Sequence, residues 1–137
     1  MALHKHIIIA VDFDGTIVED DYPKIGKEQI FAFSTMKELQ KAGHRLILWT
    51  VRNGQKLEEA VDFCKINGID FYAVNKNYPE EIQDGSISPK IYADIFIDDR
   101  NIGGFIGWGK VHQIFFGKDK TPKKENKGFF YFLKNRQ

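Results

Sequence analysis

Two aspartates stand one residue apart where an apolar run near the start of the chain ends. The run Ile7–Val11 leads directly into Asp12 and Asp14, within the string DFDGT. Two carboxylates at such a point can share a reaction, because one can attack an electrophile while the other donates and accepts protons. Partners for this pair are therefore expected at the ends of the other apolar runs.

Polar residues follow two later apolar runs. RLILWTVR ends in a hydroxyl and an arginine, ADIFIDDR ends in a second acidic pair, and SISPKIYAD places a lysine just upstream of that pair. The residues concerned are Thr50, Val51, Arg52, Lys90, Asp98 and Asp99. If these runs are neighbouring strands of one sheet, the four carboxylates crowd into one pocket beyond the strand ends.

Such a pocket requires a cation or raised pKa values, because like charges a few ångströms apart repel. The ligands are all oxygens with no Cys or His nearby in the sequence, and the acidic pattern of a Ca²⁺ loop is missing. This favours Mg²⁺ ahead of Ca²⁺. A cation, a hydroxyl and a lysine together indicate phosphoryl transfer, which mainly requires charge on the equatorial oxygens to be neutralised.

The elements that must position these residues can be read from the apolar spacing. Strands are expected at Ile7–Val11, Arg45–Thr50, Phe71–Val74 and Ile95–Ile97, and helices at Lys27–Ala42 and Gln55–Asn67. None of the strands alternates with polar residues, which is typical of parallel strands that are covered on both faces. The pattern predicts an α/β fold with a three-layer, Rossmann-like open sheet, mainly parallel, and helices on both faces.

The composition fits one globular domain. The chain has 137 residues, 42% of them hydrophobic, and its single cysteine, Cys64, excludes an internal disulfide and favours the cytoplasm. The apolar runs are too short to cross a bilayer, and acids follow the first run where the cleavage site of a signal peptide would belong. We therefore expect no membrane segment and no signal peptide.

A change in charge divides the chain into residues 1–116, expected to form the core, and a C-terminal extension at 117–137. The extension carries seven Lys and Arg against two acids, although the net charge of the whole chain is only +1. Two interpretations stay open. The extension is partly disordered and meets nucleic acid or an anionic substrate, or its GFFYFL segment packs back onto the core.

The ordered motifs resemble those of the haloacid dehalogenase superfamily. DFDGT after an apolar strand, a strand-terminal Thr, a Lys, and DD after a later strand occur in the superfamily's order and extend from Ile7 to Arg100. The match is to the phosphatase-type members, because Asp14 stands two residues after Asp12, whereas the dehalogenases lack that second acid.

The resemblance implies a role for each matched residue. Asp12 is expected to be the nucleophile and a Mg²⁺ ligand, and Asp14 the general acid/base, which also binds Mg²⁺ through its backbone carbonyl. Thr50 is expected to hydrogen-bond the phosphoryl oxygens, and Lys90 to neutralise Asp12 and the phosphate. The last acidic pair supplies the direct metal ligand Asp99 and a supporting residue, Asp98.

The expected phosphate- and substrate-binding residues are Gly15, Thr16, Thr50, Val51, Arg52 and Lys90. Arg52 either grips a second anionic group of the substrate or pairs with Glu58 or Glu59. The glycine-rich segment Asn101–Gly109 lacks the lysine of a phosphate-binding loop, so we expect it to be a flexible connection near the site.

The intervals between the motifs leave no room for the separate cap domain that many superfamily members carry. A capless member tends to act on a large substrate that closes the site, or to use a neighbouring subunit of a homo-oligomer as a lid. A small flap is expected at Val18–Ile25.

The leading hypothesis is a Mg²⁺-dependent phosphomonoester hydrolase that works through an aspartyl-phosphate. Its substrate is a small phosphorylated compound or a phosphorylated macromolecule, such as a nucleic-acid end or a phosphoprotein. A non-catalytic binding or regulatory domain of the same fold is the alternative, which loss of Asp12, Asp14 or Lys90 would favour. A phospho-acceptor signalling domain would carry its paired acids early and its phosphorylated Asp after a later strand, the reverse of the order found here.

Overall fold

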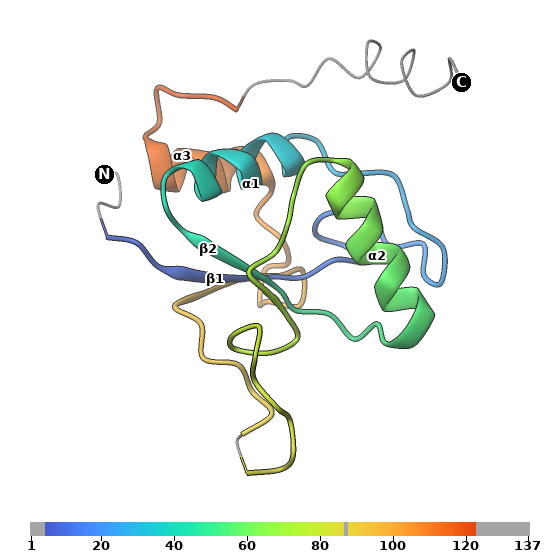
Figure 1. Cartoon of the computed structure of the whole chain (residues 1–137). Helices are drawn as coiled ribbons and strands as arrows, with labels where there is room; N and C mark the ends of the chain where they lie inside the picture. The colour runs from blue at the N-terminus through green and yellow to red at the C-terminus, as the bar shows by residue number, and fades with distance from the viewer. Residues whose placement is uncertain (1–4, 87, 123–137) are drawn as a thin grey trace.

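A computed structural model describes residues 5–86 and 88–122 of the chain. Four parallel strands form one sheet in the order β3-β2-β1-β4 (Figure 1). Their bounds are Ile8–Val11 for β1, Arg45–Leu48 for β2, Ala73–Val74 for β3 and Ile95–Ile97 for β4. Every predicted strand is present at its expected place, which confirms the α/β class and the parallel sheet.

The register of the sheet brings the carboxyl ends of three strands to one level. Val11 at the end of β1 lies opposite Leu48 of β2 on one side and Ile97 of β4 on the other. Hydrogen bonding continues one step further, where the N–H of Asp12 donates to Ile97 at 3.0 Å and that of Trp49 to Val11 at 2.8 Å. The polar residues that follow these strands therefore emerge side by side.

Three helices pack on one face of the sheet: α1 at Ala32–Lys41, α2 at Gly54–Ile66 and α3 at Trp108–Phe116 (Figure 1). Their buried side chains join Ile9, Val11, Leu46 and Leu48 in one apolar core. The other face, with Ala10 and Ile47, is covered by Ile91 and other residues around the connection from β3 to β4. In the part of the chain that is described, the helices therefore lie on one face of the sheet only. The prediction of helices on both faces is not confirmed.

Helix α1 begins later than the sequence predicts. The residues around the expected start, Lys27, pair instead with the segment that follows the DFDGT turn. The backbone N–H of Glu19 donates to the carbonyl oxygen of Lys27 at 2.7 Å, and the N–H of Gln29 donates to that of Ile17 at 2.8 Å. Phe31, in a left-handed conformation with φ 66°, then starts the helix. Gly43, with φ 97°, ends it where predicted, as a glycine after a helix commonly does.

Helix α3 was not predicted, and the interpretation of Asn101–Gly109 as a flexible connection is wrong at its end. Trp108 and Gly109 are the first residues of α3, and the Trp108 side chain is buried. Its indole Nε1 donates a 2.7 Å hydrogen bond to the carbonyl oxygen of Thr16. This bond ties α3 to the turn that carries DFDGT.

None of the helices formed by the described residues is long and apolar enough to cross a membrane. The predicted boundary at residue 116 coincides with the end of α3 at Phe116. The GFFYFL segment of the extension lies outside the described residues.

We expect Trp108→Phe to lower the free energy of unfolding by about 1–2 kcal/mol, because the buried carbonyl oxygen of Thr16 would lose its donor. The midpoint of urea unfolding measures the effect. Lys110→Ala, on the exposed side of the same helix, is the control and should change stability by less than about 0.5 kcal/mol. Equal midpoints for Trp108→Phe and the wild type would show that the bond contributes nothing.

Candidate active site

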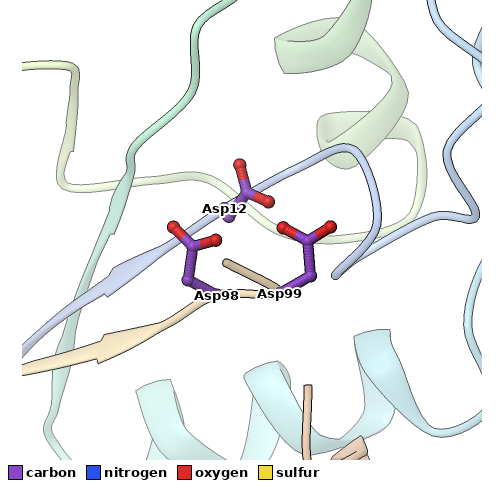
Figure 2. A group of neighbouring side chains, drawn as sticks. All are labelled: Asp12, Asp98 and Asp99. Atoms are coloured by element: carbon purple, nitrogen blue, oxygen red, sulfur yellow. The ribbon is translucent and has the colours of Figure 1, made fainter. Parts of the chain in front are cut away.

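Three aspartate carboxylates converge beyond the carboxyl ends of β1 and β4. Asp12 follows β1, and Asp98 and Asp99 follow β4, its parallel neighbour. One oxygen of each lies within 4.8 Å of the others, and Figure 2 shows both carboxylates of the β4 side directed toward Asp12. Such a set of carboxylate oxygens suits a hard divalent cation. We call these three residues the acidic cluster.

The turn after Asp12 is shaped to admit the acidic cluster. Gly15 has φ 84°, and a Cβ atom at this position would overlap Oδ2 of Asp99, so only glycine fits. The Thr16 hydroxyl donates to Asp12 Oδ2 at 3.1 Å, and its side chain is fully buried. Both residues were predicted to bind phosphate; in the structure Gly15 makes room for Asp99 and Thr16 orients the carboxylate of Asp12.

The pKa of the Asp12 carboxyl group is raised to about 8, and burial is the largest cause. The charge of Asp98 and a hydrogen bond with Asp99 contribute to this rise in pKa, and the hydrogen bond from Thr16 opposes it. An ionised carboxylate is poorly solvated here and is repelled by its neighbours. A divalent cation among the three carboxylates would offset that repulsion, so the charge of the acidic cluster fits such an ion.

Thr50 lies two residues after the end of β2, the strand that pairs with β1 on the side opposite β4. Its hydroxyl oxygen accepts a 3.1 Å hydrogen bond from the N–H of Arg52, which leaves the hydroxyl proton free to be donated to a phosphoryl oxygen. The N–H of Thr50 donates to the Asn75 side chain at 2.8 Å. The sequence analysis did not identify Asn75. The available signal was an asparagine directly after a strand, because asparagine tolerates a positive φ such as the 56° found here.

Asp14 is not part of the acidic cluster, and its side chain binds Arg52. The guanidinium of Arg52 donates to both carboxylate oxygens of Asp14 at 2.7 Å, and its side chain is fully buried. These hydrogen bonds raise the pKa of Arg52, whereas burial opposes the rise. The partner of Arg52 is therefore Asp14, and neither Glu58 nor Glu59 pairs with it.

The predicted flap takes the form of a narrow hairpin over residues 18–28. Val18 bridges to Asp14 on one side and to Glu28 on the other. Gly26 lies so near the carbonyl oxygen of Glu19 that a Cβ atom there would overlap it. The hairpin follows the DFDGT turn directly and pairs with Asp14 through Val18, so the conformation of the hairpin is linked to the position of Asp14. We call residues 18–28 the flap.

Lys90 does not join the acidic cluster. Its side chain is exposed and forms no ion pair with the residues described, and its backbone N–H donates to the Ser88 hydroxyl at 3.3 Å. The expected contact with Asp12 is therefore not formed. Val51 was also predicted to bind the phosphate or the substrate. Its side chain is 82% exposed.

A comparison with solved structures identifies a relative. A conserved protein from Bacteroides thetaiotaomicron matches with 52% sequence identity over 85% of this chain and 94% of that chain, with a TM-score of 0.77. No protein-family model matches the chain, and no curated protein matches it. The shared fold is thus supported by close sequence similarity over most of both chains.

We expect Gly15→Ala to weaken binding of Mg²⁺ by on the order of tenfold to a hundredfold, because the added methyl group displaces Asp99. The Mg²⁺ dependence of thermal stability measures this affinity. Gly85→Ala is the matched control, since Gly85 has a similar φ of 88° but open space around it. Equal losses of affinity in both variants would mean that backbone strain, and not the clash with Asp99, is responsible.

In chelator, the contribution of Asp12 to the stability of the folded state should fall as pH rises from about 4 to about 8. The folded state holds a proton on Asp12 up to its pKa of about 8, whereas the unfolded chain releases it near 3.8, so the folded state loses this advantage over that interval. Melting temperatures of the wild type and Asp12→Asn should therefore diverge in favour of the variant as pH rises. Parallel pH profiles of the two proteins would contradict the assignment.

Proposed function

This chain belongs to the same family as the conserved Bacteroides thetaiotaomicron protein, and we propose that it is a Mg²⁺-dependent phosphomonoester hydrolase of the haloacid dehalogenase type. The observation that carries the proposal is the convergence of Asp12, Asp98 and Asp99 within 4.8 Å, beside the strand end that presents Thr50. Carboxylates without a cation would repel here, and a hydroxyl beside a cation site suits a phosphoryl group.

Asp12 and Asp99, supported by Asp98, would hold the Mg²⁺ ion. When bound, the ion supplies positive charge that offsets the three carboxylates and the negative charge of the phosphoryl group. Gly15 leaves the space for Asp99, and the Thr16 hydroxyl holds one oxygen of Asp12 by a hydrogen bond, which leaves the other oxygen to act as the nucleophile. The chain's own residues thus pre-orient a nucleophilic oxygen.

In the first half of the reaction, a carboxylate oxygen of Asp12 attacks phosphorus while the bond from phosphorus to the leaving oxygen breaks. Asp14 in its protonated form gives its proton to that leaving oxygen, and the product alcohol departs. The Thr50 hydroxyl donates to an equatorial oxygen throughout. The chain then carries an aspartyl-phosphate at Asp12.

In the second half, a water molecule attacks the phosphorus of the aspartyl-phosphate. Asp14, now ionised, takes the proton of that water, and the bond between phosphorus and the Asp12 oxygen breaks. Inorganic phosphate leaves, the carboxylate of Asp12 is restored, and Asp14 is again protonated for the next turnover.

In this mechanism Lys90 would neutralise the phosphate, which requires the connection between β3 and β4 to carry the ammonium group of Lys90 toward Asp12. The site would have no cap domain, and the substrate or a neighbouring subunit would cover it. Either cover would exclude water and would strengthen the interactions with the phosphoryl group. Small phosphorylated compounds and phosphorylated macromolecules both fit this arrangement.

We expect Mg²⁺-dependent release of phosphate from 4-nitrophenyl phosphate, abolished by chelator and by Asp12→Asn. Without a nucleophilic oxygen at Asp12 no aspartyl-phosphate can form. Free phosphate, followed over time, measures the reaction. Asp94→Asn, an exposed aspartate at the opposite end of the sheet, should keep its activity and is the control. Release that continues in chelator, or in Asp12→Asn, would contradict the proposal.

Asp14→Asn should keep Mg²⁺ binding and lose turnover by on the order of a hundredfold or more, since the metal contact expected of Asp14 is made by its backbone and the proton transfer by its side chain. Mg²⁺-dependent melting and steady-state turnover separate the two roles. Retained turnover would exclude Asp14 as the acid/base.

A further inference from the structure

Arg52 uses all of its hydrogen-bond donors inside the protein. Nε and Nη2 donate to the two oxygens of Asp14 at 2.7 Å. Nη2 also donates to the carbonyl oxygen of Lys24 at 2.8 Å, and Nη1 donates to those of Pro23 and Lys56 at 3.3 and 3.4 Å. A guanidinium has five N–H donors, so none is left over for a substrate. Arg52 therefore does not grip an anionic group of the substrate.

The surroundings of Arg52 fix the plane of its guanidinium. Its side chain is fully buried, and the guanidinium carbon lies 5.1 Å from the centre of the Phe13 ring and 5.0 Å from that of Tyr22. Tyr22, Pro23 and Lys24 belong to the flap, whereas Lys56 belongs to α2. The orientation of the guanidinium thus depends on the flap, on the first turn of α2 and on the DFDGT turn together.

A planar, bidentate donor of this kind also fixes the plane of the carboxylate that it binds. The side-chain torsion of a lone aspartate is broad, but a guanidinium held in place admits one orientation of its partner. The Asp14 side chain is 13% exposed, so part of it stays accessible beside the two hydrogen bonds with Arg52. A displacement of about 1 Å in such a group can lower a rate a hundredfold.

We propose that Arg52 is a positioning residue for Asp14, and that the flap sets the direction of the Asp14 carboxylate through Arg52. The inference rests on the proposed function, in which Asp14 gives a proton to the leaving oxygen. Arg52 touches neither the substrate nor the reacting atoms. Its influence on the reaction passes through the two hydrogen bonds with Asp14.

This role has a chemical signature that a general loss of stability lacks. A nitrophenolate leaves without a proton, whereas the alkoxide formed from benzyl phosphate needs one. Misplacing Asp14 should therefore harm hydrolysis of benzyl phosphate far more than hydrolysis of 4-nitrophenyl phosphate. A variant that is merely less folded would lose both activities by the same factor.

The experiment measures kcat and KM for both substrates, with Mg²⁺, in the full-length wild type, Arg52→Gln and Arg52→Lys. We expect kcat for benzyl phosphate to fall on the order of a hundredfold more than kcat for 4-nitrophenyl phosphate, while KM changes by less than about threefold. Arg52→Lys should behave like Arg52→Gln, because a lysine keeps the charge but cannot bind both oxygens of Asp14 in one plane.

Two further variants keep the test decisive. Arg45→Gln, at the other end of β2, removes an exposed arginine that also stacks on a tyrosine, Tyr72, and should leave both rates unchanged. Tyr22→Ala opens the outer side of Arg52 at a residue that is 55% exposed, so the chain should still fold. In Tyr22→Ala, kcat for benzyl phosphate should fall about threefold more than kcat for 4-nitrophenyl phosphate. If the Arg52 variants do not fold, Tyr22→Ala alone tests the positioning role.

Equal losses on the two substrates in the Arg52 or Tyr22 variants, with an active wild type, would overturn the positioning role and leave the proposed function standing. A wild type that hydrolyses neither substrate would overturn the proposed function and this inference with it.

Discussion

Mutual repulsion of three carboxylates is the constraint around which the rest of this structure is arranged. Asp12, Asp98 and Asp99 are close because β1 and β4 are paired in register and end at the same level. The strands themselves are apolar and are held by a core that includes side chains from α1, α2 and α3. The free energy released by burying those apolar side chains holds together charges that would otherwise separate.

Each polar group beside the acidic cluster is anchored by a different element of the fold. Thr50 is held by Asn75 after β3, the DFDGT turn by Trp108 of α3, and the carboxylate of Asp14 by Arg52. Arg52 in turn binds carbonyl oxygens of the flap and of α2. The candidate site is therefore a junction of many elements, and its geometry depends on how they pack and not on any single motif.

The parts of the fold that depend on local apolar patterns could be predicted from the sequence. The four strands and the C-terminal glycine stop of α1 follow from runs and spacings that a single segment contains. The acidic cluster was also predictable, because strand-terminal acids in a parallel sheet meet at one edge. Helix α3 was overlooked although Val111 and Phe115, four residues apart, supply an apolar stripe.

Other features depend on contacts between segments that are distant in the sequence. The partner of Arg52 lies 38 residues away, so the nearby Glu58 and Glu59 were more obvious choices. Helix α1 starts later than predicted because the residues before it pair with the start of the flap, a tertiary interaction that overrides helix propensity. Whether a lysine upstream of a strand reaches an acid after another strand depends on the path of the connection between them, which spacing alone does not specify.

The segment that joins β3 to β4 begins beside Thr50 and passes over the face of the sheet that the described helices leave free (Figure 1). Most of the described residues between 78 and 90 are exposed, and few apolar side chains among them are buried in the core. Lengthening a surface segment of this kind changes the entropy of loop closure only slowly. Relatives could therefore diverge in the exposed part of this segment that precedes Lys90, and so in the surface beside that face of the sheet, without disturbing the acidic cluster, Thr50 or Asp14.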